Sequence, residues 1–244
     1  MIVTGGGRGI GAAIARLAAT QGYAICISYL NDEKAAAEVV ASIAARGANA
    51  VAVRADVAVE KDVMRLFEQV DSSLGRVAAL VNNAGILQRQ ARVEEMDSER
   101  ITRVFATNVV GSFICSREAV RRMSTRHGGS GGAIVNISSR AARLGSPGEY
   151  VDYAASKAAV ETLTIGLARE VAAEGIRVNA VAPGIIYTDI HASGGEPGRV
   201  DRIKDGIPMK RGGTADEVAR AVLWLLSDDA SYSTGAIIDV AGGR

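Results

Sequence analysis

The sequence predicts a doubly wound α/β fold, in which a mainly parallel sheet carries helices on both faces. Short apolar runs of β type alternate along the whole chain with longer amphipathic runs of helical period. The apolar runs also lack the in-and-out alternation of a half-exposed strand, which indicates burial on both faces. Strands that alternate with helices in this way form a parallel sheet joined by right-handed crossovers.

Seven strands are expected, one for each apolar run. They are Met1–Thr4, Tyr23–Ser28, Ala50–Arg54, Ala78–Asn82, Gly132–Ile137, Arg177–Val181 and Ala236–Asp239. Helices are expected between them, near residues 9–21, 32–46, 59–73, 97–126, 151–174 and 214–227. The first strand is short for a central strand, because a glycine-rich stretch follows almost at once.

No linker, low-complexity segment or change of composition divides the 244 residues. A chain of this length can bury one large hydrophobic core. We therefore expect a single domain over residues 1–244, with one long excursion over residues 185–211 inside it.

Composition excludes several classes of protein. The chain is 48% hydrophobic and 23% charged, as soluble globular proteins are, and its net charge of +1 gives no general attraction to nucleic acid or anionic membranes. No apolar run approaches the ~20 residues of a membrane span, and the N-terminus does not resemble a signal peptide. Cys26 and Cys115 lack metal-like spacing, so we expect no metal site and a reducing, cytoplasmic setting. Arg117, Arg121, Arg122 and Arg126 are interpreted as a solvated helix face.

A glycine-rich loop, Thr4–Gly11, follows the first strand and opens the first helix. Its glycines permit positive φ, and the free amides of a helix start favour a pyrophosphate. Gly11 is followed by Ala12 rather than Lys, which disfavours a P-loop, and the G-x-G-x-x-G spacing is not met either. The strand–loop–helix context predicts a Rossmann-type dinucleotide site. The expected contacts in the loop are Thr4, Gly5, Gly7, Arg8, Gly9, Ile10 and Gly11.

The end of the second strand bears on the choice of dinucleotide. An acid about 20 residues beyond the loop would bind the ribose hydroxyls of NAD, but Ser28, Tyr29 and Leu30 include none. Asp32 comes late and suits the cap of the next helix. Arg8 can meet a 2′-phosphate, so NADP is favoured and NAD stays possible. Tyr29 is included among the expected cofactor contacts.

The stretch Ala133–Lys157 has the outline of an acid–base site. An apolar strand ends in Ser138 and Ser139, and a loop leads to a helix that carries Tyr153 and Lys157. The four-residue spacing places phenol and ammonium on one helical face. A nearby cation favours phenolate, so we expect the pKa of Tyr153 to lie below its usual value of about 10. The pair alone is a weak signal, since such spacings also arise by chance.

Taken together, these motifs resemble the short-chain dehydrogenase/reductase family over essentially the whole chain. The sugar (glucose 1-) dehydrogenase and 3-oxoacyl-carrier-protein-reductase branches are the most similar. The motifs are Thr4-Gly5-x-x-x-Gly9-x-Gly11, Asp56-Val57, Asn82-Asn83-Ala84-Gly85, Asn108, Ser139, Tyr153-x-x-x-Lys157 and Pro183-Gly184. Each motif is modest by itself, but seven in the right order are specific.

For the cofactor, the resemblance implies contacts along the whole dinucleotide. It places Asp56 and Val57 at the adenine, although a plain helix cap suits Asp56 equally well on spacing. It places Asn83, Ala84 and Gly85 at the adenosine ribose. Pro183 and Gly184 would cover the nicotinamide, with Ile186 and Thr188 at the carboxamide.

For catalysis, the resemblance implies that Tyr153 exchanges a proton with the substrate oxygen while a serine holds that oxygen. Lys157 would bind the nicotinamide ribose, and Asn108 would hold a water that links Lys157 to solvent. Ser139 is favoured as the serine, but one extra residue before Tyr153 leaves Ser138 open.

Tyr150 is excluded as the catalytic tyrosine, because its i+4 partner is Ala154.

The excursion over residues 185–211 is expected to be the substrate-binding lid. It is polar and glycine-rich, which favours a small polar, sugar-like substrate over a hydrophobic acyl chain. The alternatives are a 3-oxoacyl-carrier-protein reductase and, more remotely, a non-catalytic dinucleotide-binding scaffold. Arg199, Arg202 and Lys204 suit a solvated helix, or alternatively a site for an acidic carrier or a phosphate. His191 is expected to be polar surface, with substrate contact as the alternative.

The resemblance finally implies a homo-oligomer. Dimers of this family pair their two long helices, and tetramers also use the C-terminal strand. The last residues, Ile237–Gly243, resemble that strand, so a homotetramer is expected by resemblance.

Overall fold

The computed structural model describes residues 1–244, which surround one seven-stranded sheet in the order β3-β2-β1-β4-β5-β6-β7. All six pairs of neighbouring strands are parallel. The predicted doubly wound parallel sheet is therefore confirmed, and it has no antiparallel member. The strands are β1 Ile2–Val3, β2 Ile25–Tyr29, β3 Ala50–Arg54, β4 Ala79–Asn82, β5 Gly132–Ile137, β6 Ile176–Pro183 and β7 Ile237–Val240.

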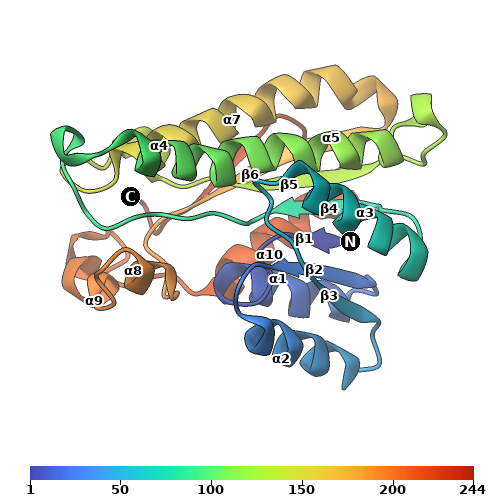
Figure 1. Cartoon of the computed structure of the whole chain (residues 1–244), viewed down its shortest axis with the longest axis horizontal. Helices are drawn as coiled ribbons and strands as arrows, with labels where there is room; N and C mark the ends of the chain where they lie inside the picture. Colours follow the sequence, from blue (N-terminus) through green and yellow to red (C-terminus); the bar gives the residue numbers. More distant parts are fainter.

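Helices cover both faces of the sheet (Figure 1). The α-helices are α1 Gly9–Thr20, α2 Glu33–Ala44, α3 Glu60–Ser73, α4 Ser98–Phe105, α5 Gly111–Met123, α6 Ala141–Leu144, α7 Val151–Val171, α8 Ile190–Ser193, α9 Arg199–Ile203 and α10 Ala215–Leu226. Short 3₁₀ turns cover Val93–Glu95, Thr125–His127, Ala172–Glu174, Lys204–Gly206 and Asp228–Ala230. None of the helices is both long and apolar enough to cross a membrane.

Two hydrophobic cores lie on opposite faces of the sheet, and successive strand residues alternate between them. Val3 of β1 packs into a core with α1, α2 and α10, whereas Ile2 packs into the core of α3, α5 and α7. Both side chains are fully buried. The strands therefore appear continuously apolar in the sequence because each face of the sheet meets a helix layer.

The predicted helix over residues 97–126 is divided. Helix α4 ends at Phe105, a π-helical segment covers Ala106–Val110, and α5 then continues to Met123. The π segment contains Asn108, whose side chain is fully buried. Wide turns of this kind are frequent at functional sites.

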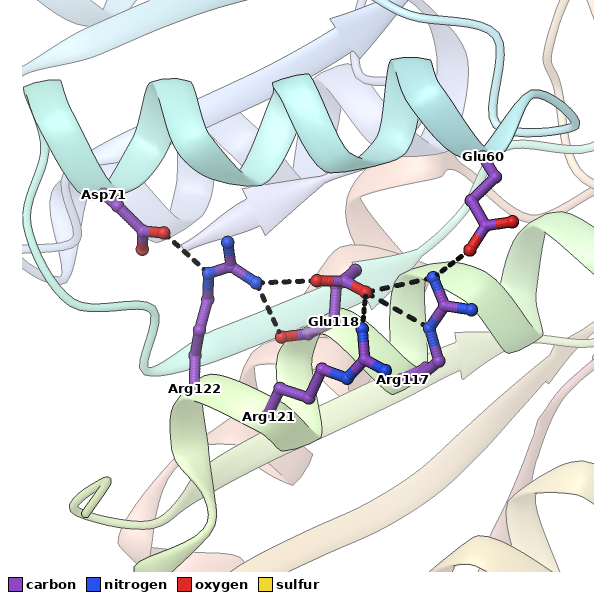
Figure 2. A network of polar contacts seen from close by, with 6 residues as sticks. All are labelled: Glu60, Asp71, Arg117, Glu118, Arg121 and Arg122. Atoms are coloured by element: carbon purple, nitrogen blue, oxygen red, sulfur yellow. Dashed lines mark hydrogen bonds and ion pairs between the residues drawn. The ribbon is translucent and has the colours of Figure 1, made fainter. Parts of the chain in front are cut away.

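An ion-pair network joins α3 to α5 on one side of the molecule (Figure 2). The buried Glu118 receives hydrogen bonds from Arg117, Arg121 and Arg122, and Arg122 also contacts Asp71 of α3 at 2.7 Å. Burial alone would raise the pKa of Glu118, but hydrogen bonds from Arg122 and Arg117 hold it below its usual value. The expectation of a solvated arginine face is therefore only partly right: the side chains of Arg121 and Arg117 are 58% and 39% exposed, but these arginines also neutralise a buried carboxylate.

A buried amide ladder crosses the sheet beneath its carboxyl edge. Asn82 of β4 lies beside Asn136 of β5 in register, and its Nδ2 donates to Asn136 Oδ1 at 2.8 Å. Asn136 Nδ2 in turn donates to Thr164 of α7 at 2.9 Å. The ladder holds α7 against the end of β5, where Ser138 and Ser139 follow.

Candidate active site

The glycine loop between β1 and α1 presents free backbone donors. Gly5 and Gly9 have φ of +62° and +54°, which residues with a side chain rarely adopt. The loop is anchored to the end of β2, since Gly5 N donates to Ser28 Oγ and Gly6 N donates to Ser28 O. In contrast, the backbone N–H groups of the next four residues donate to no acceptor within the chain: Gly7, Arg8, Gly9 and Ile10. Free amides at a helix start fit a pyrophosphate.

Thr4 and Asn83 brace this loop from inside. The Thr4 hydroxyl is buried, donates to Val81 O, and accepts from the backbone of Asn83 and Ala84. The Asn83 side chain donates to the carbonyls of Thr4 and Gly5. Both side chains are therefore used within the protein, so Thr4 supports a cofactor site rather than offering its hydroxyl to one.

Around the end of β2 the structure places two exposed arginines. Arg8 stands at the start of α1 with no ion pair or hydrogen bond from its side chain. Arg54 of β3 pairs in register with Tyr29 and donates to Leu30 O. Sequence reasoning missed Arg54, because only the strand register brings it beside Tyr29. Asp32 caps α2 as predicted, accepting from Ala35 N at 2.9 Å.

Asp56 and Val57 follow β3. One carboxylate oxygen of Asp56 accepts from Ala58 N, while the helix cap itself is Val59. Val57 is buried, and a Cβ on Gly111 would lie 2.8 Å from the Val57 side chain. The start of α5 therefore packs closely against Val57.

A cavity of about 460 Å³ opens at the carboxyl ends of the strands, a volume usual for small-molecule sites. It is lined by many of the expected site residues: Ile10, Asn83, Gly85, Ser139, Tyr153, Lys157, Pro183, Gly184, Ile186 and Thr188. The other expected residues lie outside its wall: Thr4, Gly5, Gly7, Arg8, Gly9, Gly11, Tyr29, Asp56, Val57, Ala84 and Asn108. Thr188 lies 3.6 Å from where a Cβ on Gly9 would be, so the segment after β6 adjoins the glycine loop.

The two serines after β5 point to different partners. Ser139 lies beside Tyr153, where its hydroxyl lowers the pKa of the phenol, and its Oγ accepts from Ala141 N at 3.2 Å. Ser138 is buried and donates to Glu161 Oε1 at 2.9 Å. Both serines line the cavity, but the Ser138 hydroxyl is bonded to Glu161, whereas Ser139 is the serine beside Tyr153.

Tyr153 and Lys157 lie on one face of α7, but their electrostatics differ from expectation. Burial raises the pKa of Tyr153 to about 12, and the hydrogen bond from Ser139 only partly opposes it. Burial lowers the pKa of Lys157 to about 8. The Lys157 Nζ donates to Ile137 O at 2.7 Å and lies 5.6 Å from the centre of the Tyr153 ring. The expectation of a lowered Tyr153 pKa is wrong. The loss of hydration around the phenol outweighs the effect of the Lys157 ammonium, which lies over the ring.

Asn108 is held on all sides. Its Oδ1 accepts from Ile86 N, and its Nδ2 donates to Ile86 O and to Ser156 Oγ. A Cβ on Gly85 would lie 3.3 Å from Lys157 Nζ and 3.4 Å from Asn108 Oδ1. The Lys157 ammonium and the Asn108 amide therefore both lie beside Gly85, and Asn108 reaches this position from the π-helical segment.

The segment over residues 185–211, which the sequence predicts to be the lid, contains α8, α9 and a 3₁₀ turn, and its base is fixed by backbone contacts. An isolated parallel bridge joins Ile186 to Gly213, and Tyr187 N donates to Gly213 O. His191 is 9% exposed and lines the cavity, so its interpretation as polar surface is wrong.

Arg199 is likewise not solvated, because its side chain is only 8% exposed. It binds both carboxylate oxygens of Glu149, contacts Glu196 at 3.0 Å, and lies over the Tyr150 ring at 5.4 Å. Sequence reasoning missed this cluster, since Glu149 and Arg199 are 50 positions apart and no motif links them. Tyr150, which lacks a lysine four positions later, also lines the cavity.

The description of the family model that matches residues 5–244 is enoyl-(acyl carrier protein) reductase. The chain is 60% identical to the uncharacterized oxidoreductase YgfF of Escherichia coli, over 100% of this chain and 98% of that protein. It is 38% identical to the 3-oxoacyl-[acyl-carrier-protein] reductase FabG of Staphylococcus epidermidis, over 99% and 97% of the two chains.

Solved structures show the same similarity. A short-chain dehydrogenase of Burkholderia cenocepacia in complex with NADP superimposes with a TM-score of 0.90 at 34% identity, over 99% of this chain and 96% of that one. A short-chain type dehydrogenase/reductase of Mycobacterium marinum gives 0.92 at 33% identity, over 99% and 93%.

Proposed function

The chain belongs to the short-chain dehydrogenase/reductase family and is an oxidoreductase, and we propose that it transfers a hydride between NADP(H) and a small polar, sugar-like substrate. The bond formed or broken would be to a carbinol or carbonyl carbon. One observation carries this proposal: Ser139, Tyr153 and Lys157 share a 460 Å³ cavity at the carboxyl edge of the sheet. Parallel α/β sheets bind their ligands at that edge.

The residues present fit a dinucleotide. Four free amides at the start of α1 suit a pyrophosphate, and the glycine loop gives it close access to the backbone. The exposed Arg8 carries no partner that a 2′-phosphate would have to displace. The NADP bound to the Burkholderia neighbour agrees with this choice.

Arg8→Ala tests the cofactor preference. Loss of one charged hydrogen bond should weaken NADPH binding about tenfold or more and leave NADH binding unchanged. Arg16→Ala is the matched control, since Arg16 also lies on α1 but donates to Ser42. Equal losses for both nucleotides in fluorescence titrations would contradict the preference for NADP.

For the chemistry, the bound nicotinamide would supply or accept the hydride, and the protein would manage the oxygen and its proton. With its Oγ already accepting from Ala141 N, Ser139 would donate to the substrate oxygen. Burial raises the pKa of Tyr153, so the phenol is protonated near neutral pH and would donate that proton to a carbonyl oxygen. The buried Lys157 would bind the ribose, and Asn108 would hold the water that returns protons from solvent.

The lid supports a small polar substrate. It brings His191 and Arg199 to the cavity wall beside Glu149, where an acyl tunnel would need apolar side chains. The assay is absorbance of NADPH and NADH across sugars, small hydroxylated carbonyls and acetoacetyl thioesters. Turnover of thioesters alone would replace this substrate class with the second candidate below.

The second candidate is a 3-oxoacyl-carrier-protein reductase. The relatives of that name at 38% identity favour it, and the family model also carries a carrier-protein name. It would need a basic docking surface near the cavity, yet Arg199 and Arg202 are occupied by Glu149 and Glu196.

We also propose a homo-oligomer built on α5 and α7. Phe113 of α5 is 51% exposed and Ile165 of α7 is 36% exposed, although both are large and apolar. A second copy would cover such side chains. Light scattering that shows a monomer at assay concentrations would contradict this proposal.

A further inference from the structure

His191 occupies an unusual place for a lid residue. It lies in α8, is 9% exposed, and lines the same cavity as Ser139 and Tyr153. The mechanism above gives it no task. A buried histidine on the wall of a substrate cavity has two ring nitrogens, and the partner of one decides what the other can do.

The Nε2 atom is committed. It lies 2.9 Å from the backbone oxygen of Ile186, in the segment after β6. A carbonyl oxygen can only accept, so Nε2 must carry the hydrogen. Burial lowers the pKa of His191, which keeps the ring neutral at physiological pH. In a neutral ring with its proton on Nε2, Nδ1 is a bare acceptor.

The Nδ1 atom has no partner in the chain, yet it is not sealed off. Arg140 Nε is the one fully buried side-chain nitrogen or oxygen that lacks a hydrogen bond, so the unpaired Nδ1 keeps some accessible surface. His191 is among the residues that line the cavity, so a ligand there would lie beside its ring. A buried acceptor of this kind gains by meeting a donor.

Neighbouring polar groups on that wall are already satisfied. Arg199 is held by Glu149 and Glu196, and the Tyr150 hydroxyl approaches Gly194 O at 3.5 Å. Gly194 itself is closely packed, since a Cβ there would lie 2.4 Å from Leu87. Beside these satisfied groups, His191 Nδ1 is a free acceptor in a fixed position.

We propose that His191 is a specificity-determining residue whose Nδ1 accepts a hydrogen bond from a hydroxyl of the substrate. The substrate class is then a hydroxylated carbonyl compound or the corresponding polyol, in which a hydroxyl accompanies the reacting carbon. This inference rests on the proposed function. An acyl chain without a hydroxyl would leave Nδ1 buried and unpaired.

Two amide substitutions separate the two nitrogens. In His191→Gln the amide nitrogen can take the place of Nε2 and keep the bond to Ile186, while the acceptor at Nδ1 is lost. In His191→Asn the amide oxygen takes the place of Nδ1 and keeps the acceptor, while the bond to Ile186 is lost. The probes are glyceraldehyde against propanal and erythrose against butanal, each with NADPH.

We expect the wild type to prefer the hydroxylated member of each pair by about tenfold in kcat/KM, the effect of one hydrogen bond. His191→Gln should remove that preference, and His191→Asn should retain part of it. A His191→Gln variant with the wild-type preference would overturn the inference, as would a wild type that reduces both members equally. A wild type that reduces no carbonyl compound would instead refute the proposed function, and the inference with it.

A second measurement needs no substrate. Two-bond proton–nitrogen correlation spectra of the ¹⁵N-labelled protein distinguish a protonated ring nitrogen from a bare one. We expect His191 to show a protonated Nε2 and a bare Nδ1 near neutral pH. A proton on Nδ1 would overturn the inference whatever the kinetics show.

Discussion

The Arg199 cluster predicts that one buried guanidinium holds the lid in place. Arg199→Met keeps the apolar stem but removes a side chain that is 8% exposed and binds two carboxylates. Breaking a fully buried pair costs about 3–5 kcal/mol, whereas an exposed pair contributes about 0–1 kcal/mol. The partners Glu149 and Glu196 are 31% and 24% exposed, so water partly compensates them and we expect a loss of about 2 kcal/mol.

In a chain of this size, that loss corresponds to a fall of about 4–8 °C in Tm. Arg202→Met is the matched control, because Arg202 also binds Glu196 but is 56% exposed, and it should lower Tm by no more than about 4 °C and by less than Arg199→Met does. Differential scanning calorimetry of both variants at one protein concentration makes the comparison. Trypsin should also cleave the lid faster in Arg199→Met alone. Equal Tm values for the two variants would refute the reasoning.

Two further predictions concern the cofactor half of the site. Because burial lowers the pKa of Lys157 to about 8, its ammonium is present below that pH and lost above it, so kcat/KM should fall as pH rises through about 8. A flat pH profile from 7 to 9.5 would contradict this assignment. Gly11→Ala should abolish dinucleotide binding in calorimetric titrations, since its Cβ would lie 2.5 Å from both Asn83 Nδ2 and Gly5 O. Gly206→Ala meets nothing within 4 Å and should bind normally, and normal binding by Gly11→Ala would show that the loop can move aside.

The fold was predictable because its signals are local. Each strand is an apolar run whose residues serve two cores in turn, and Asp32 caps α2 where the sequence places a cap. The π segment around Asn108 was not predictable in the same way. It depends on hydrogen bonds to Ile86 and Ser156, which lie 22 and 48 positions away.

The candidate site likewise has features that local sequence predicts and features that depend on the folded structure. Tyr153 and Lys157 could be paired from helical spacing, but the direction of the Tyr153 pKa could not, because it depends on how much water the fold removes. Arg199 and His191 were misjudged for a related reason. A polar residue in a polar loop is usually solvated, and only the folded lid turns these two side chains inward.

The central claim is that Tyr153 exchanges the proton with the substrate oxygen. In Tyr153→Phe, NADPH should bind as it does to the wild type, while kcat/KM with the best carbonyl substrate should fall at least about 100-fold. Tyr150→Phe is the control, since Tyr150 lines the same cavity but its hydroxyl only approaches Gly194 O at 3.5 Å, and it should retain most of the turnover. Turnover in Tyr153→Phe within about tenfold of the wild type would contradict the account.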